Sequence, residues 1–345
     1  MYVFYHIIQN MYWIPAHLSD MILLPKKAEP RRENYRRYIA MNNLPSAITL
    51  CEVGLRDGLQ NEKALLPTQR KIELLQGLID AGFKVIEVGS FMHPKAVPQM
   101  ADTDEVYRAV GDVPGVELRA LIPNLRGVKR AADCGCKKVK LNVSASRQHN
   151  LKNLNMTPEE SVAGFAACVE ESLANGIAIS GSISMPFASP WEGRIPVGDI
   201  ESIIEAYLNV GITEISLSDT SGMGVPNHVY QLCAHVKEKY PQVSWWLHFH
   251  NTRGLAIANI LAAMEAGMTQ FDGSFGGLGG CPFVPNAAGN ISTEDVLNMC
   301  DEMGIETGVD IVKVMELSRQ MKELLGHDLD SYILRAGRAK DLIVG

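Results

Sequence analysis

The 345-residue sequence lacks several features that would assign it to a class at once. It has no run of about 18 apolar residues, so no membrane-spanning helix is expected. An excess of basic charge is also absent: 32 Lys and Arg against 39 Asp and Glu give a net charge of -7, which argues against a general binder of nucleic acid or of an anionic membrane. Because 46% of the residues are hydrophobic and 21% charged, the composition still supplies a large core and excludes disorder as the dominant state.

Cysteine is too sparse and too irregularly spaced for a structural framework. Seven cysteines in so long a chain favour free thiols in a reducing compartment, and we expect a cytoplasmic protein. No C-x-x-C pair occurs, and only one glycine separates Cys134 from Cys136, so we expect a turn there rather than a zinc site. The ending of a phosphate-binding loop and a complete dinucleotide fingerprint are also missing, which leaves nicotinamide binding without support.

The first 46 residues differ in character from the rest. They carry six basic and three acidic residues, whereas residues 47–345 carry 26 and 36. A secretory signal is not expected because the positive charges follow the apolar residues, and serine is too scarce for a transit peptide. We therefore expect an N-terminal extension of little structural weight at 1–46, with alternative starts at Met21 and Met41, followed by one domain at 47–345.

From residue 47 onward, short apolar and β-branched segments alternate with stretches of helical spacing. Helices are expected over 67–81, 157–175, 197–210, 256–266, 310–325 and 331–343, and several of these stretches end in glycine. The strand candidates are 47–54, 85–90, 117–123, 138–144, 178–185, 214–220, 243–250 and 270–277. Eight alternating units predict an α/β fold: a (β/α)8 TIM barrel with extra C-terminal helices.

Active sites of such barrels lie at the carboxyl ends of the strands, so polar residues at those ends are the candidates for chemistry. In chain order they are Arg56, Asp57, Glu87, Asn142, Ser144, Asp219, His248 and His250. A glycine-rich loop follows the eighth strand. We expect these groups to converge on one mouth of the barrel.

Two histidines at the end of the seventh strand are the sharpest local signal. Because side chains two apart in a strand share a face, His248 and His250 project together while Phe249 faces the helices. The pair makes half of a divalent-metal site, and an incidental pair of core histidines is the alternative. Oxygen ligands are expected to complete the site, with Asp57 as the carboxylate and Asn290 as a carbonyl donor. Such mixed ligation suits Mg²⁺ or Mn²⁺, although Zn²⁺ or Co²⁺ would also bind.

Arg56 places a permanent cation beside the expected metal ligand Asp57. One interpretation is an ion pair with Glu52 or Glu87. The functional interpretation is a donor aimed at an oxyanion that develops during a reaction.

The segment 275–282 (FGGLGGCP) is a second signal, because four glycines within five residues suit a mobile lid. A thiol in that loop, Cys281, would gain thiolate character from a nearby metal and arginine. The other isolated cysteines are expected to be buried packing residues: Cys51, Cys168, Cys233 and Cys300.

Together these motifs resemble those of the 3-hydroxy-3-methylglutaryl-CoA lyase family, within a superfamily of metal-dependent barrel lyases and Claisen-type synthases. The resemblance covers about residues 48–308. It is carried by 52–62 (EVGLRDGLQNE), 82–87 (GFKVIE), 97–100 (VPQM), 218–220 (SDT), 248–250 (HFH) and 277–283 (GLGGCPF), followed by Gly289 and Asn290. The last loop separates the lyases from the related synthases.

The resemblance implies a role for each matching residue. The implied ligands of a divalent metal cofactor, Mg²⁺ or Mn²⁺, are Asp57, His248, His250 and Asn290. Arg56 would stabilise the negative charge that develops during the reaction, and Cys281 would transfer a proton. The expected catalytic set consists of these two residues together with Asp57 and His248. The expected substrate-binding set is Arg56, Gln60, Glu87, Asn142 and Asp219, of which the two acidic residues match positions that support the site.

The implied reaction is a retro-Claisen cleavage of 3-hydroxy-3-methylglutaryl-CoA to acetoacetate and acetyl-CoA, as in leucine degradation and ketone-body metabolism. Loss of the tertiary hydroxyl proton would break the adjacent carbon–carbon bond, and the resulting enolate would be stabilised and then protonated. The expected partners are therefore a CoA thioester and a second copy of the chain in a homodimer, with neither nucleic acid nor membrane.

Some segments depart from the pattern of the better-known lyases. Residues 184–193 lack the cysteine and glycine found after the fifth strand, and residues 142–146 and 251–253 also differ. A related 3-hydroxy-3-alkylglutaryl-CoA or a citramalyl-type thioester therefore stays open as the substrate. Two other classes also stay open: a thiol hydrolase using Cys281, which a chelator would not inhibit, and a noncatalytic metal-binding barrel, which would release no thioester products.

Overall fold

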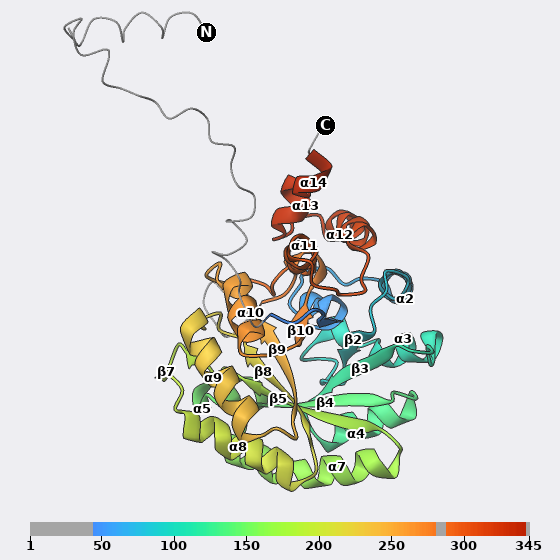
Figure 1. The fold of residues 1–345 in the computed structure, drawn as a ribbon. Helices are drawn as coiled ribbons and strands as arrows, with labels where there is room; N and C mark the ends of the chain where they lie inside the picture. Colours follow the sequence, from blue (N-terminus) through green and yellow to red (C-terminus); the bar gives the residue numbers. More distant parts are fainter. Residues whose placement is uncertain (1–43, 281–287, 343–345) are drawn as a thin grey trace, which may run out of the picture. The chain divides into compact units, whose positions relative to one another are not determined.

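The computed structural model describes residues 44–280 and 288–342. Within these ranges eight parallel strands close into a barrel in the order β1-β10-β9-β8-β5-β4-β3-β2, and helices surround it (Figure 1). The predicted (β/α)8 TIM barrel with additional C-terminal helices is thus confirmed. The extension at 1–46 lies almost entirely outside the described residues, so its dispensability stays a prediction.

All eight predicted strands form, with ends that differ by a few residues. The barrel strands are β1 (Thr49–Glu52), β2 (Val85–Ser90), β3 (Glu117–Ile122), β4 (Lys138–Ser144), β5 (Ala178–Ser184), β8 (Glu214–Asp219), β9 (Ser244–Phe249) and β10 (Gln270–Gly273). A short antiparallel hairpin that the sequence did not predict follows β5 and consists of β6 (Ala188–Ser189) and β7 (Gly193–Arg194).

The helices mostly occupy the predicted stretches. They are α2 (Thr68–Asp80), α3 (Thr103–Val110), α4 (Leu125–Asp133), α5 (Arg147–Leu154), α6 (Pro158–Ala163), α7 (Phe165–Ala174), α8 (Val197–Asn209), α9 (Pro226–Lys239), α10 (Ala256–Glu265), α11 (Thr293–Met303), α12 (Ile311–Leu325), α13 (Tyr332–Ala336) and α14 (Ala339–Leu342). Short helical turns are η1 (Gly54–Gly58), η2 (Pro98–Met100) and η3 (Phe275–Gly277).

Two predicted helices are each divided in two by a glycine. The stretch 157–175 breaks at Gly164 into α6 and α7, consistent with the low helix propensity of glycine. The C-terminal stretch breaks at Gly337, whose φ of 79° lies in the left-handed region that ends a helix. These breaks change the helix boundaries and leave the order of barrel units unchanged.

Side chains alternate between the barrel interior and the layer under the helices. Leu247 and Phe249 of β9 are buried in the main hydrophobic core, whereas Trp246 belongs to a separate small cluster with Cys51 and Val53. His248 shares the parity of Trp246 and borders the cavity at the barrel mouth. This is the alternation predicted for the HFH segment.

Tyr207 of α8 fixes this helix to the barrel wall. Its hydroxyl donates to the carbonyl oxygens of Leu141 at 2.8 Å and Ser182 at 3.0 Å, and its ring stacks on Phe165 with centroids 4.5 Å apart. A Cβ at Gly181 would lie 2.8 Å from this ring, so only glycine permits the close approach.

Glu52 joins the end of β1 to the turn after β10 and thereby shapes the loop that follows β1. Its buried carboxylate accepts from the backbone N–H of Gly54 at 2.7 Å, from that of Phe275 at 3.0 Å and from Thr293 Oγ1 at 2.7 Å. Because β1 ends at this residue, the chain turns at once into η1, a single π-helical turn that contains Arg56 and Asp57.

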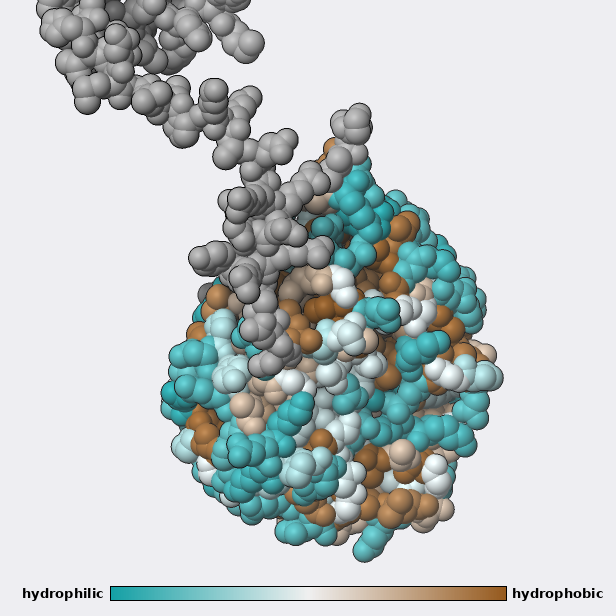
Figure 2. Space-filling model, in the orientation of Figure 1, coloured by the Kyte–Doolittle hydropathy of each residue, from teal (hydrophilic) through white to brown (hydrophobic). Residues whose placement is uncertain are grey.

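The surface shows hydrophobic residues interspersed with hydrophilic ones on the face drawn in Figure 2. Exposed large apolar side chains include Leu65, Leu173 and Tyr332, which come from different parts of the chain. Isolated apolar residues of this kind are ordinary for a folded domain. In the described ranges no helix is both long and apolar enough to cross a membrane.

Candidate active site

A cavity of about 100 Å³ lies at the mouth where the carboxyl ends of the strands meet. Six of the residues predicted from the sequence line it: Arg56, Asp57, Gln60, Asn142, His248 and His250. Arg56 and Asp57 lie in η1 and Gln60 lies two residues after it, Asn142 lies on β4, and His248 and His250 lie at and just after the end of β9. The structure thus brings together, at one mouth, side chains that are up to 194 positions apart in the sequence.

Asp57, His248 and His250 form a compact cluster with the composition of a divalent-metal site. Asp57 Oδ2 lies 3.4 Å from His250 Nε2 and 3.9 Å from His248 Nε2, and one ligand atom from each residue lies within 4.8 Å of the others. All three side chains are buried. Two imidazole nitrogens and a carboxylate oxygen at this spacing fit a single divalent ion.

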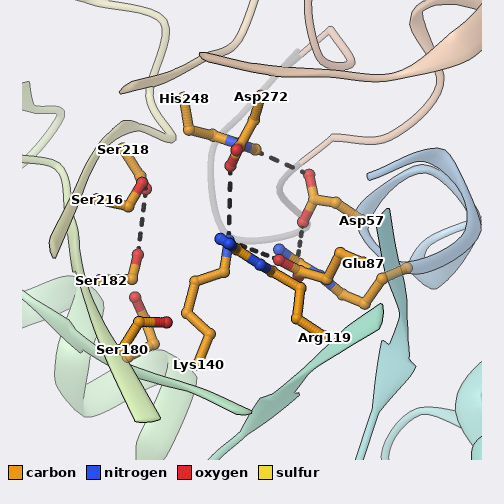
Figure 3. A network of polar contacts seen from close by, with 12 residues as sticks. Asp57, Glu87, Arg119, Lys140, Ser180, Ser182, Ser216, Ser218, His248 and Asp272 are labelled. Carbon is orange, nitrogen blue, oxygen red and sulfur yellow. Dashed lines mark hydrogen bonds and ion pairs between the residues drawn. The ribbon is translucent and has the colours of Figure 1, made fainter. Parts of the chain in front are cut away.

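Asp272 of β10 orients one of these histidines. Its Oδ2 lies 3.1 Å from His248 Nδ1, which leaves Nε2 directed at Asp57 (Figure 3). Burial opposes ionisation of Asp272, but Lys140 and His248 together lower its pKa to about 2. A carboxylate that binds the second nitrogen of a metal-site histidine fixes the tautomer and the ring orientation. No motif in the sequence marks Asp272.

Asn290 also reaches the cluster, through its side-chain amide nitrogen. Nδ2 donates to Asp57 Oδ2 at 2.7 Å and to the Leu278 carbonyl oxygen at 2.9 Å. In this amide orientation the nitrogen, and not Oδ1, faces Asp57. Its predicted role as an oxygen ligand therefore stays a prediction, with the residue placed beside the three others.

Arg56 makes two ion pairs inside the site. Its Nη1 contacts Asp57 Oδ1 and its Nε contacts Glu87 Oε1, and all three side chains are buried. Of the two ion pairs considered from the sequence, the one with Glu87 forms, whereas Glu52 is bonded to backbone and Thr293 instead. Burial disfavours the charged guanidinium, but Asp57 and Glu87 raise the pKa of Arg56 above its ordinary value.

The same contacts keep Asp57 ionised. Burial opposes its charge, yet the Arg56 guanidinium and the two neighbouring histidines hold the pKa of Asp57 well below its usual range. A carboxylate with such a low pKa is a good metal ligand and a weak general base.

Of the substrate-binding residues predicted from the sequence, some line the cavity and others lie outside its lining. Gln60 and Asn142 line the cavity, and Glu87 lies fully buried behind Arg56. Asp219 instead accepts from the backbone N–H groups of Met223 at 3.1 Å and Gly224 at 2.9 Å, and so shapes the loop after β8. The neighbours of Asp219 in the sequence, Ser218 and Thr220, line the cavity in its place.

Several cavity residues had no sequence signal of their own. Lys140 of β4 pairs with Glu87 and lies near Asp272, and serine hydroxyls form much of the wall from β5 and β8 (Figure 3). In that wall Ser182 Oγ lies 3.2 Å from Ser218 Oγ, and Ser184 Oγ donates to Asn142 Oδ1 at 2.9 Å. The inward parity of β4 would have placed Lys140 and Asn142 on one face, but it does not identify their partners.

The described start of the glycine-rich loop passes directly beside the cluster. A Cβ on Gly279 would lie 2.5 Å from Asn290 Nδ2, and Gly280 borders the cavity while its carbonyl accepts from Asn61 Nδ2 at 2.6 Å. Cys281, the predicted proton-transfer group, lies outside the described residues, so its role stays a prediction. The other cysteines expected to be packing residues are all buried: Cys51, Cys168, Cys233 and Cys300.

Comparison with known proteins points to one family. The family model described as HMGL-like matches residues 47–321. The mitochondrial hydroxymethylglutaryl-CoA lyase of Macaca fascicularis is 38% identical over 297 residues, which cover 86% of this chain and 91% of the relative. A 3-hydroxy-3-methylglutaryl-CoA lyase of Mus musculus described as cytoplasmic is 38% identical over 293 residues, covering 85% of each protein.

Solved structures agree with these sequence matches. An HMG-CoA lyase from A. baumannii, in complex with coenzyme A and 3-methylmalate, has a TM-score of 0.83 and 43% identity, and the match covers 87% of this chain and 98% of that one. The hydroxymethylglutaryl-CoA lyase from Pseudomonas aeruginosa has a TM-score of 0.82 and 37% identity, over 86% and 99% of the two chains. The carboxyl transferase domain of Rhizobium etli pyruvate carboxylase, with 16% identity and a TM-score of 0.63, shares the fold alone.

Proposed function

This chain belongs to the HMGL-like family, and from that premise we propose how its barrel cleaves 3-hydroxy-3-methylglutaryl-CoA. The enzyme is a carbon–carbon lyase, and the products of the cleavage are acetoacetate and acetyl-CoA. The observation that carries the proposal is the direct contact, inside one cavity, between the Arg56 guanidinium and Asp57 of a three-residue metal cluster. An oxyanion donor and a site for a Lewis acid would therefore both reach one substrate molecule bound in the cavity.

The residues that would hold a divalent metal are Asp57, His248 and His250, with Asn290 as the further ligand that we propose. Bound there, Mg²⁺ or Mn²⁺ would supply Lewis acidity to the oxygens of the substrate. Asp272 keeps His248 in the tautomer whose Nε2 is free for this purpose. The choice of metal rests on the mixed nitrogen and oxygen donors, which do not select strongly for Zn²⁺.

Arg56 would stabilise the enolate of acetyl-CoA that forms when the carbon–carbon bond breaks. Two of its nitrogens are already held, one by Glu87 and one by Asp57, so the guanidinium is oriented before substrate binds. A preorganised donor in a buried site contributes about 3 to 4 kcal/mol to catalysis when it meets charge that develops in the transition state. The low pKa of Asp57 suits a metal ligand better than a proton acceptor, so we assign removal of the tertiary hydroxyl proton to a water molecule in the cavity.

We assign the protonation of the enolate carbon to Cys281, on the basis of its position in the GLGGCP loop. The loop begins beside the cluster, at Gly279 and Gly280. A thiol hydrolase would need a rigidly held cysteine next to a base. Two of the three histidines that line the cavity, His248 and His250, lie against Asp57 and so favour a metal site over a thiol–imidazole pair.

The acyl part of the substrate would lie between two unlike walls. Apolar side chains, among them Leu121 and Ile122 of β3, form one wall, and the serines of β5 and β8 form the other. The cavity measures only about 100 Å³, and this small volume favours the methyl substituent of 3-hydroxy-3-methylglutaryl-CoA over longer branches. A citramalyl-type thioester, which is equally short, stays the second candidate.

A substrate panel tests this assignment. Purified protein with Mg²⁺ would be incubated with 3-hydroxy-3-methylglutaryl-CoA, with a longer 3-alkyl analogue and with citramalyl-CoA, and the products identified by mass. We expect the highest kcat/KM for the methylglutaryl thioester. A higher kcat/KM for the 3-alkyl analogue or for citramalyl-CoA would change the proposed substrate but not the proposed lyase reaction.

We also propose that the enzyme works as a homodimer in the cytoplasm. The cytoplasmic assignment rests on cysteine usage and the dimer on the family resemblance. Light scattering coupled to gel filtration, and fractionation of cells that express the protein, test the two statements separately.

A further inference from the structure

Lys140 is a buried cation at the cavity to which the reaction scheme above gives no role. It lies on β4 and is only 3% exposed, yet its side chain borders the cavity. Nζ lies 2.5 Å from Glu87 Oε2 and 3.5 Å from Asp272 Oδ2 (Figure 3). Glu87 Oε2 has no hydrogen-bond partner of good geometry among the described residues, so its contact with Lys140 is an ion pair held by charge.

Each of these two carboxylates holds one functional group of the site. Glu87 uses its other oxygen, Oε1, to bind Arg56 Nε. Asp272 Oδ2 binds His248 Nδ1 at 3.1 Å. Lys140 therefore stands in the middle of a continuous series of contacts that begins at the oxyanion donor and ends at a histidine of the metal cluster.

We propose that Lys140 is a positioning residue that holds Glu87 and Asp272 together and so aims Arg56 and His248 at the same point of the cavity. Without the charge of Lys140, the buried carboxylates of Glu87 and Asp272 would repel each other. Movement of either carboxylate would displace the group bonded to it, which is Arg56 or His248. Arg119, the other buried cation nearby, pairs with Glu117 and with Glu214, at 3.2 Å from the latter. Among the described residues it forms no ion pair with Glu87 or Asp272, although its charge also helps to lower the pKa of Asp272.

Lys138 provides a matched control on the same strand. It also faces inward, is 8% exposed, and pairs with Glu214 Oε2 at 2.7 Å. It neither lines the cavity nor contacts Glu87 or Asp272 in the described part of the chain. Removing its charge deletes a buried ion pair of the same kind without touching the series from Arg56 to His248.

The first measurement compares the Lys140→Met and Lys138→Met variants, and it rests on the proposed function because it uses 3-hydroxy-3-methylglutaryl-CoA. We expect kcat to fall about 10- to 100-fold in Lys140→Met, the usual effect of losing a group that orients catalytic ligands. The KM of Lys140→Met should stay within about threefold of the wild-type value, because Lys140 is proposed to position other residues. Both kcat and KM of Lys138→Met should also stay within about threefold of the wild-type values. Equal losses in the two variants, or a wild-type kcat in Lys140→Met, would overturn the proposal.

The second measurement needs no substrate. In ¹⁵N-histidine-labelled protein treated with a chelator, the Nδ1–H signal of His248, assigned with a His248→Asn variant, reports its bond to Asp272. We expect this signal to shift in Lys140→Met and to stay in place in Lys138→Met, and an unmoved signal in both would overturn the positioning role. If Lys140→Met does not fold, Lys140→Gln, which keeps a donor but no charge, carries both measurements. Failure of the wild type to cleave the thioester would refute the proposed function alone, because the nuclear magnetic resonance result still decides the role of Lys140.

Discussion

Replacing Arg56 by lysine separates charge from geometry at the centre of the proposed site. The guanidinium contacts Glu87 through Nε and Asp57 through Nη1, so two different nitrogens hold it in place while others remain for the substrate. Lysine offers one nitrogen, which cannot bind both carboxylates and also reach a developing oxyanion. The Arg56→Lys variant should therefore keep a positive charge in the cavity and lose the oriented donor.

The size of the effect follows from which atoms are involved. Loss of one preorganised oxyanion donor costs about 10²- to 10³-fold in kcat. Metal binding should change much less, because the guanidinium contacts Asp57 Oδ1 whereas the two histidines approach Oδ2, at 3.4 and 3.9 Å. We therefore expect a large loss of turnover with Mn²⁺ affinity within about one order of magnitude of the wild type.

Steady-state rates with 3-hydroxy-3-methylglutaryl-CoA and Mn²⁺ titration followed by electron paramagnetic resonance give the two numbers. Arg119→Lys is the matched control, since this arginine is also buried in the barrel but pairs with Glu117 and Glu214 away from the cavity lining. Its kcat should stay close to that of the wild type. Full turnover in Arg56→Lys would remove the oxyanion role, and a parallel loss of Mn²⁺ binding would show that Arg56 serves the metal site instead.

Four further predictions concern other parts of the chain. His248→Ala or Asp57→Ala should weaken Mn²⁺ binding by at least about tenfold, because each removes a ligand; unchanged titration curves in both would contradict the metal assignment. Cys281→Ser should lower kcat by about two to four orders of magnitude with metal binding intact, and Cys281 should alkylate faster than the other thiols unless substrate protects it; a fully active serine variant with slow labelling would return it to a packing role. A chain that starts at Met41 should keep its activity and Tm, whereas insoluble protein would show that the extension packs on the barrel. Burial lowers the pKa of His149 to about 4, so protonation of this residue favours the unfolded chain. The free energy of unfolding should therefore fall by up to about 3 kcal/mol as the pH drops from about 6.5 to 4. Denaturant titrations of the His149→Phe variant should show a smaller decrease over the same pH range.

The fold could be predicted from the sequence because each strand and helix of the barrel has its own local pattern of apolar residues and turns. Apolar segments such as Val85–Ser90 and Lys138–Ser144 coincide with the strands of the structure, since the spacing of β-branched residues and the following turns define both. Strand parity also placed His248 and His250 on one face. The unpredicted π-helical turn η1 arises from tertiary contacts of Glu52 with residues more than 200 positions away, which no local pattern encodes.

The supporting residues of the site were harder to find for a related reason. Asp272 and Lys140 lie inside strands and have no motif of their own, and their importance comes from meeting across the barrel interior. Strand parity also distinguishes two neighbours: Ser218 borders the cavity, whereas Asp219 binds the following loop, and the predicted role of Asp219 in substrate binding stays a prediction. For Arg56, the ion pair and the position at the cavity turned out to be compatible, because Glu87 orients the same guanidinium that borders the cavity.

The product balance of one reaction tests the proposed metal-dependent carbon–carbon cleavage directly. Purified protein would be treated with a chelator, supplied with Mg²⁺ and 3-hydroxy-3-methylglutaryl-CoA, and its products quantified by mass spectrometry. We expect equal amounts of acetoacetate and acetyl-CoA, formed with Mg²⁺ and not without it. Release of free coenzyme A with 3-hydroxy-3-methylglutarate, or cleavage that persists in the chelator, would contradict it.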